Sequence, residues 1–259
     1  MSGVIGRVTF LGTGTSHGVP MIGCRCAVCT SPDPRDQRLR PSILVELATG
    51  GSLLVDTAPD LRAQALRYSV RRVDAVLFTH PHADHLLGLD EIRRFNTLQH
   101  AVIPCYGDPG TIAEIRRVFA YAFEPRQHGG GVPRLELIPV SGPFVVAGTV
   151  VTPVPVMHGH LPIYGYRIGS FAYLTDCSAI PDGAWPLLDG VRTLVIDALR
   201  HVPHPTHFTV AQALEAVARL RPARALLTHI AHDLGHAETA GRLPQGVELA
   251  YDGLIVDIE

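Results

Sequence analysis

Apolar runs separated by polar, glycine-rich and proline-rich segments divide the chain into alternating strands and helices. Residues 7–12, 42–47 and 52–57 are predicted strands, and the Gly50-Gly51 pair between the last two predicts a hairpin turn. A helix is expected at about 60–68. Residues 73–79 are almost continuously apolar, which is typical of a strand covered on both faces.

The second half of the chain continues this alternation. Helical spacing appears at 89–95 and again at 209–220, where the apolar residues form one face. Residues 133–156 are strand-rich, and further strands are predicted at 171–176, 193–198 and 223–229. Four of the predicted strands end in a potential metal-ligand side chain, namely His80, Asp176, Asp197 and His229. In α/β folds ligands bind at the carboxyl ends of strands, so we expect a site there.

Composition limits the possible classes of protein. With 259 residues and 46% hydrophobic content, the chain can bury a substantial core, and we expect a single domain over residues 1–259. The net charge is −2 and every basic residue is arginine, so there is no strong electrostatic footprint for nucleic acid. We find no secretory signal or apolar membrane span, and we therefore expect a cytoplasmic protein that does not bind membranes.

The stretch HPHADH at 80–85 concentrates three histidines and one aspartate directly after a buried strand. Imidazole nitrogens and a carboxylate at this spacing suit one or two borderline divalent cations, with further ligands from elsewhere in the chain. Five cysteines, an odd number, argue against a disulfide framework, and three of them lie together in GCRCAVC. A metal site is the better interpretation of this group as well.

The stretch THPHADH resembles the signature of the metallo-β-lactamase superfamily. Histidine in PVMHGH, aspartate in YLTDCS and histidine in LLTHIAH follow in the order that the superfamily uses. The resemblance implies an αββα sandwich, in which two mixed sheets are flanked by helices and the site lies on the edge between the sheets. It also implies one metal on His80, His82 and His158, a second on Asp84, His85 and His229, and Asp176 bridging the two.

The N-terminal stretch FLGTGTSHGVPMIGCRCAVC is similar to the start of PhnP-type phosphodiesterases within that superfamily. This similarity implies a structural zinc that clamps a loop at about residues 12–42. Its expected ligands are Cys24, Cys26, Cys29 and His232. Three weaker expectations concern Asp56, which would orient a metal-binding imidazole, His207, which would face the substrate, and His17, which would approach the substrate or stabilise its loop.

The implied function is hydrolysis of a small cyclic phosphate or a nucleotide-like phosphodiester by a hydroxide that bridges the two metals. Asp84 would act within the catalytic metal site, and His207 would protonate the leaving alkoxide. The catalytic pair would be zinc or manganese, with iron as a further option, and the clamp would hold zinc. The expected partner is a small-molecule substrate, and a homodimer is possible.

Four other functions share parts of this pattern. A thioester hydrolase of the glyoxalase II type has a similar metal loop but not the cysteine group. A tRNA 3′-processing nuclease also has the metal loop, but it normally carries a long basic or glycine-rich arm. A flavodiiron-type redox protein needs glutamate at the position of His82. A zinc-stabilised binding module would lack the catalytic metals.

Overall fold

The computed structural model describes residues 4–124 and 131–259, and this part of the chain contains two seven-stranded sheets. The first sheet has the order β14-β1-β2-β3-β4-β5-β6, and the second has the order β13-β12-β11-β10-β9-β8-β7. The strands of the first sheet are β1 (Gly6–Gly12), β2 (Ser42–Leu47), β3 (Ser52–Val55), β4 (Ala75–Leu77), β5 (Ile103–Gly107), β6 (Leu135–Pro139) and β14 (Ile255–Ile258). Those of the second are β7 (Phe144–Val146), β8 (Thr149–His158), β9 (Leu161–Ile168), β10 (Phe171–Leu174), β11 (Thr193–Asp197), β12 (Arg224–Thr228) and β13 (Val247–Leu249).

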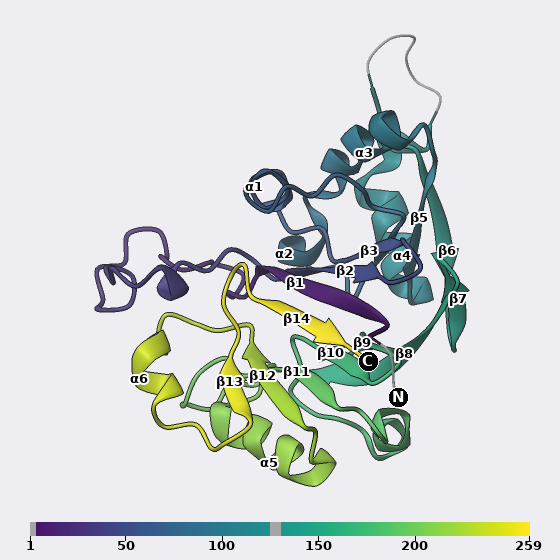
Figure 1. Cartoon of the computed structure of the whole chain (residues 1–259). Helices are drawn as coiled ribbons and strands as arrows, with labels where there is room; N and C mark the ends of the chain where they lie inside the picture. The colour runs from purple at the N-terminus through teal and green to yellow at the C-terminus, as the bar shows by residue number, and fades with distance from the viewer. Residues whose placement is uncertain (1–3, 125–130) are drawn as a thin grey trace.

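Helices cover the outer faces of both sheets. The α-helices are α1 (Leu61–Arg67), α2 (Ala83–Leu86), α3 (Ile92–Gln99), α4 (Pro109–Val118), α5 (Val210–Leu220) and α6 (His236–Ala240). Short 3₁₀ helices lie at Pro34–Asp36, Leu89–Glu91, Ala120–Ala122 and Asp182–Leu188. In Figure 1, α1, α3 and α4 lie beside the first sheet, and α5 lies beside β11 and β12 of the second.

Three clusters of buried apolar side chains fill the spaces between the layers of sheets and helices. One cluster contains Val45, Leu53 and Tyr173 and fills the space between the two sheets. The other two lie between each sheet and its helices. In β10, Ala172 packs toward the helices while Tyr173 packs toward the other sheet, because successive strand residues point to opposite faces. Both faces of these strands are therefore buried, which explains their continuous apolar sequences, and the expected αββα sandwich is confirmed.

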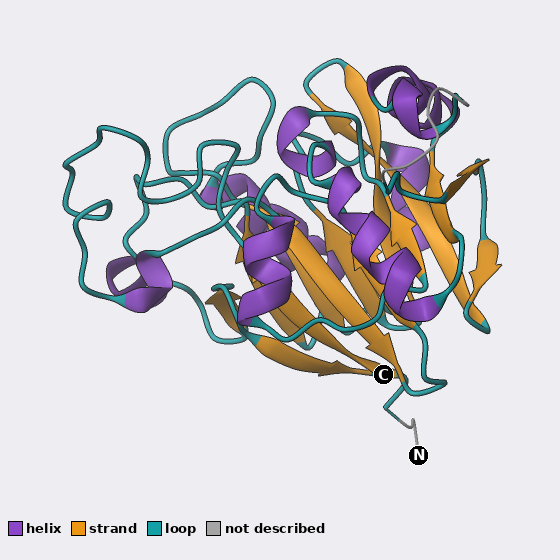
Figure 2. Cartoon of the chain, turned by 90° about the horizontal axis from the view of Figure 1, so that it is seen from above, coloured by secondary structure: helices purple, strands orange, loops and turns teal. Residues whose placement is uncertain are grey.

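Parallel pairing brings the predicted strand ends together. β3 pairs with β4 in the first sheet, and β10, β11 and β12 pair in sequence in the second, all of them parallel. The carboxyl ends of neighbouring parallel strands lie at one edge, so the loops that follow them form a single rim. Figure 2 shows the long loops gathered on one side of the sheets, away from the C-terminus.

The elements predicted from hydrophobic pattern agree with the structure. The hairpin at Gly50-Gly51 joins the antiparallel strands β2 and β3. The helix predicted at 209–220 is α5, which begins after Thr209 in a capping box with Gln212. The segment between β1 and β2 runs out from the body of the molecule before it returns (Figure 1). That the chain forms one domain stays a prediction.

Candidate metal centre and active site

Three candidate site residues have a strained backbone where their strands end. Asp56 follows β3, Asp176 lies two residues after β10, and His229 follows β12. Their φ angles are 62°, 54° and 58°, in the left-handed region that side chains other than glycine rarely adopt. Such conformations persist only where the surrounding structure enforces them, and they concentrate at functional sites. The three residues mark the edge between the sheets as a candidate site.

The histidine loop joins β4 to the short helix α2. Tyr166 from the second sheet donates its buried hydroxyl to the carbonyl of Phe78 at 2.7 Å, which fixes the start of the loop. His82 has an extended backbone and precedes α2, and Asp84 and His85 lie within that helix. The loop therefore presents its ionisable side chains toward the edge between the sheets.

The first group of candidate ligands contains three histidines from both sheets. One ring nitrogen each of His80, His82 and His158 lies within 4.8 Å of the others. His80 Nε2 and His82 Nδ1 are 3.0 Å apart. Two nitrogens that bind one tetrahedral zinc lie about 3.3 Å apart, so this spacing fits a shared metal ion.

The second group surrounds Asp176. Its Oδ2 lies 3.1 Å from His85 Nε2 and 3.2 Å from His229 Nδ1. Asp84 Oδ2 lies 3.3 Å from the same nitrogen of His85. The other oxygen of Asp176, Oδ1, lies 4.0 Å from His80 Nε2 in the first group. One carboxylate thus faces both groups, which is the arrangement that a bridging ligand requires.

Hydrogen bonds behind the imidazoles fix their orientation. Asp56 accepts from Thr79 N and Oγ1, both at 2.8 Å, and its Oδ2 lies 2.7 Å from His85 Nδ1. Thr79 Oγ1 also lies 3.0 Å from His80 Nδ1. His158 Nδ1 lies 2.9 Å from the carbonyl of Asp176. In each case the ring nitrogen away from the site is engaged, which leaves the other nitrogen for a metal.

The electrostatics of the site fit a bound cation. Burial lowers the pKa of His80, His158 and His229, the last to about 4, so these rings are neutral near pH 7 as metal ligands must be. Burial disfavours protonation of His85, yet Asp176 and the other nearby carboxylates raise its pKa well above the ordinary value. The carboxylates therefore attract positive charge at this point.

Two ring nitrogens at the site also lack a hydrogen bond. His85 Nε2 and His229 Nδ1 are buried and have no hydrogen-bond partner within the described residues. An unsatisfied buried polar atom costs about 1–3 kcal/mol. Both atoms lie within 3.3 Å of carboxylate oxygens and would be satisfied as metal ligands, so the residues present fit divalent metal ions.

The cysteine group meets His232 at a second candidate metal site. Ligand atoms of Cys24, Cys26, Cys29 and His232 lie within 4.8 Å of one another. His232 Nδ1 lies 3.3 Å from the sulfurs of Cys24 and Cys26 and 3.7 Å from that of Cys29. Sulfur and nitrogen on one tetrahedral zinc lie about 3.5 Å apart. A backbone hydrogen bond from Cys29 lowers the pKa of Cys26 to about 6, which favours the thiolate that binds metal.

His207 lies against the metal centre and is paired with an aspartate from the end of β11. Its ring stacks on that of His229 with centroids 4.7 Å apart and meets His158 edge-on at 4.8 Å. Its Nδ1 is 2.8 Å from Oδ2 of the fully buried Asp197. Burial raises the pKa of Asp197 to about 7, and the hydrogen bond to Asp197 outweighs burial to raise the pKa of His207. The pair therefore retains a proton near neutral pH.

The sequence placed Asp197 among the strand-ending ligand types but did not predict its pairing with His207. The available signal was its position, because it ends a buried strand as Asp176 does. Its partner His207 follows ten residues later, beyond a loop with no regular pattern, so the pairing could not be read from spacing.

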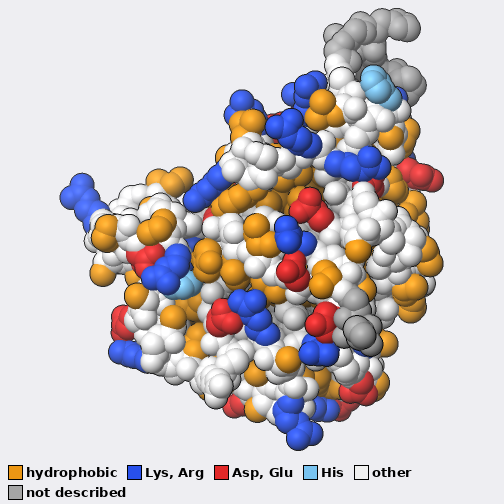
Figure 3. Space-filling view, viewed as in Figure 1, with side chains coloured by type: hydrophobic (Ala, Val, Ile, Leu, Met, Phe, Trp, Pro, Cys, Tyr) orange, Lys and Arg blue, Asp and Glu red, His pale blue; other side chains and the backbone are white. Residues whose placement is uncertain are grey.

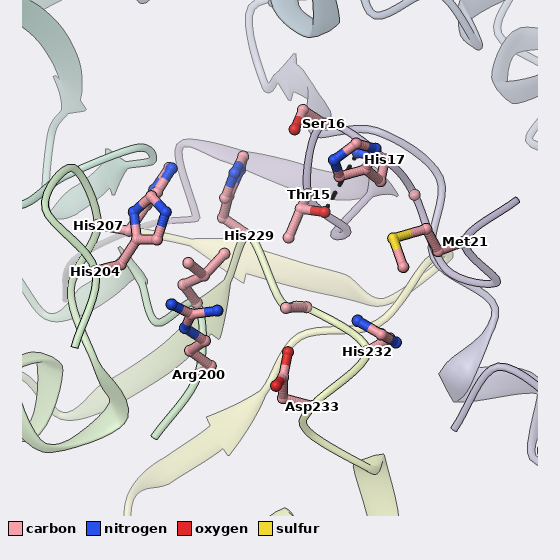
Figure 4. A pocket seen from close by; sticks show the side chains of 13 residues that line it. Thr15, Ser16, His17, Met21, Arg200, His204, His207, His229, His232 and Asp233 are labelled. Carbon is pink, nitrogen blue, oxygen red and sulfur yellow. Dashed lines mark hydrogen bonds between the residues drawn. The ribbon is translucent and has the colours of Figure 1, made fainter. Parts of the chain in front are cut away.

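A cleft of about 270 Å³ adjoins the metal centre, and its wall includes His17, His207, His229 and His232 (Figure 4). His17 comes from the loop after β1, on the side of the cleft opposite His204 and His207 in this view. It therefore lies where it could meet a substrate, and no contact between its ring and a candidate metal ligand is present in the described structure. No helix in the described residues is long and apolar enough to cross a bilayer.

Comparison with known proteins supports the assignment that the geometry suggests. The family model of the beta-lactamase superfamily domain matches residues 52–230. A crystal structure of a diphosphatase from the PhnP family superposes with a TM-score of 0.91 at 45% identity, and the match covers 98% of both chains.

Two curated relatives are similar over part of their own length. An octanoyltransferase of Porphyromonas gingivalis is 39% identical over 252 residues, which are 96% of this chain and 51% of that protein. A ribonuclease Z of Bradyrhizobium sp. is 32% identical over 164 residues, which are 58% of this chain and 52% of that protein. The chain thus spans about half the length of these relatives. Since the superfamily model matches more than half of the chain and the PhnP-family likeness covers nearly all of it, the chain belongs to the PhnP family of the metallo-β-lactamase superfamily of metal-dependent hydrolases.

Proposed function

We propose that the protein is a binuclear metal-dependent phosphodiesterase that acts on small phosphodiesters or diphosphates. The observation that carries this proposal is the position of His207, which lies over the metal ligands and is held by a buried carboxylate. A hydrolase for a phosphate ester needs a proton donor close to its metal ions, because an alkoxide is a poor leaving group. The diphosphatase activity named for the PhnP-family structure supports phosphorus chemistry.

The residues that would hold the two catalytic ions form two sets with one shared member. His80, His82 and His158 would hold one ion, Asp84, His85 and His229 would hold the second, and Asp176 would contact both. Zinc or manganese suits this set of nitrogen and oxygen ligands. When bound, such a pair supplies an activated water and neutralises the charge of the phosphate oxygens. A separate zinc in the cysteine clamp would tie the N-terminal loop to the loop that carries His229.

His207 would act as the general acid. Nδ1 is engaged with Asp197, so the opposite nitrogen, Nε2, is free to carry a proton to the leaving oxygen. The buried carboxylate fixes the tautomer and the orientation of the ring, and it stabilises the imidazolium. Thr206 contributes indirectly, since its carbonyl lies 2.9 Å from His158 Nδ1 and thereby ties the His207 loop to a metal ligand.

Replacement of His207 by alanine tests this role. The variant should lose about 100-fold or more in kcat on an alkyl or ribose cyclic phosphate, yet remain close to wild type on bis(p-nitrophenyl) phosphate, whose leaving group needs no proton. His201→Ala is the matched control, because this exposed histidine lies on the same loop. Metal content should be unchanged in both variants. Equal losses on both substrates would exclude the proton-donor role, and loss of metal would make His207 a ligand.

A substrate panel tests the class of reaction. It should contain ribose cyclic phosphates, cyclic nucleotides, diphosphates, a thioester and a precursor tRNA, each assayed with zinc, manganese and iron. Because the chain is similar to a ribonuclease Z, the assay with precursor tRNA is informative. On the face seen in Figure 3, however, basic and acidic side chains are interspersed and give no broad basic surface for a polynucleotide. Hydrolysis of only the thioester or only the tRNA would overturn the proposal.

A further inference from the structure

Arg200 contributes the only Lys or Arg side chain to the described lining of the cleft beside the metal centre. The same cleft is lined by His207 and His229, so Arg200 shares it with the proposed proton donor and a metal ligand (Figure 4). The proposed chemistry assigns Arg200 no role. A fixed positive charge beside a site for anionic substrates nevertheless bears on what that site can bind.

The backbone around Arg200 is held by the segment that follows His207. Leu199 N donates to the carbonyl of Phe208 at 2.9 Å, and Val210 N donates to the carbonyl of Arg200 at 3.0 Å. These bonds make a short parallel bridge between Arg200 and Thr209. The position of Arg200 relative to His207 is therefore set by the backbone, and no movement of a long loop is needed to bring them together.

The guanidinium of Arg200 is partly oriented and lacks an acidic partner. Nε donates to the carbonyl of Val202 at 3.1 Å, and Nη2 donates weakly to that of Pro203 at 3.4 Å. Within the described residues no carboxylate forms an ion pair with it, and the exposed Asp233 is the only acidic residue in the cleft lining. Nη1 and the remaining N–H groups are left for a ligand.

The neighbouring imidazole of His204 does not supply this charge. Burial lowers the pKa of His204, and the positive charges of His207 and Arg200 lower it further. The guanidinium fork matches the geometry of phosphate oxygens and donates two parallel hydrogen bonds to them. Arg200 thus presents phosphate-binding chemistry on the wall of the cleft that holds the proton donor.

We propose that Arg200 forms an anion subsite for a second phosphoryl group, so that the preferred substrates carry a phosphate next to the one that is hydrolysed. This inference rests on the proposed phosphodiesterase function and narrows it to diphosphate linkages and to phosphodiesters that bear an adjacent phosphate. Arg200 is a specificity residue in this view, because it contacts the neighbouring group and takes no part in bond cleavage.

Two substrates measured with the same variants test the subsite. ADP-ribose presents a second phosphoryl group, whereas bis(p-nitrophenyl) phosphate presents only one. Arg200→Gln should lower kcat/KM for ADP-ribose by about 10- to 100-fold, mainly through KM, since a hydrogen-bonded charge is lost. The same variant should remain within about twofold of wild type on bis(p-nitrophenyl) phosphate. Arg200→Lys should recover part of the loss, because it keeps the charge but not the fork.

A matched control separates the subsite from a general loss of charge. Arg62→Gln makes the same charge change at an exposed position on α1 outside the cleft, and it should leave both substrates unaffected. Inorganic diphosphate should inhibit wild type more strongly than inorganic phosphate, and Arg200→Gln should remove that difference. Equal losses on both substrates, or none on ADP-ribose, would overturn the subsite while leaving the phosphodiesterase proposal intact. If wild type hydrolysed neither substrate with any metal, both proposals would fail.

Discussion

Replacing Arg38 by methionine should destabilise the protein strongly, because this arginine is a buried connection between the N-terminal loop and the C-terminal half. Its side chain is 0% exposed. Nη1 donates to the carbonyl of Ala231 at 2.9 Å, and Nη2 donates to the carbonyl of Leu234 at 2.7 Å and to Asp36 at 2.8 Å. Asp36 also accepts from His236 N at 2.8 Å. One guanidinium therefore holds both sides of the segment that carries His232.

The expected magnitude follows from what the substitution leaves behind. Methionine fills much of the space of the arginine stem but leaves Asp36 buried without its cation and removes the guanidinium donors from the carbonyls of Ala231 and Leu234. Removing one partner of a buried ion pair costs about 3–5 kcal/mol. For a chain of this size that loss lowers Tm by roughly 6–20 °C. The surface pair of Arg35 with Asp33 offers a matched comparison, since exposed pairs contribute about 0–1 kcal/mol.

Thermal and urea unfolding of the metal-loaded proteins, followed by circular dichroism, would measure the effect. Arg38→Met should melt far below wild type, and Arg35→Ala should melt within about 2 °C of it. Adding Asp36→Asn to Arg38→Met should recover part of the loss, because the uncompensated buried charge is then absent. If Arg38→Met and Arg35→Ala had the same Tm, the interpretation of Arg38 as a buried connection would be wrong.

Three further predictions concern the metal sites and the proton donor. Cys26→Ser should release the clamp zinc and lower Tm, because the loop has little apolar surface of its own. If elemental analysis found the zinc retained, Cys26 would be excluded as a ligand. Asp197→Asn should lower kcat by about 100-fold on a substrate with a poor leaving group and spare bis(p-nitrophenyl) phosphate, and a uniform loss would indicate a structural role instead. Asp197 raises the pKa of His207, so wild-type activity on a substrate with a poor leaving group should persist above the ordinary histidine pKa and then fall as His207 loses its proton. In Asp197→Asn the fall in activity should begin at lower pH. A pH–rate profile that is unchanged in this variant would contradict the pairing.

Most local elements, and the chemistry at their ends, could be predicted from the sequence alone. Strands such as 73–79 and helix 209–220 have a periodicity that depends only on neighbouring residues, so they could be predicted without the fold. The histidine loop and the cysteine group are each contiguous in sequence, and each strand-ending aspartate directly follows an apolar run, so their residue types indicated metal binding. The strands β9, β13 and β14 and the helix α4 were not among the predicted elements.

The contacts between groups that are distant in sequence follow from the packing of the fold. Cys24 and His232 are 208 residues apart in sequence, and Arg38 and Leu234 are 196 residues apart, yet each pair is in contact. No local spacing encodes such contacts, because they arise from the pairing of β14 with β1 and from the packing of the two sheets. The same packing brings Asp197 to His207 and holds Asp176 between both groups of imidazoles. The sequence thus supplied the ligand types, whereas the shared edge of two sheets set their distances, their orientation and their pKa values.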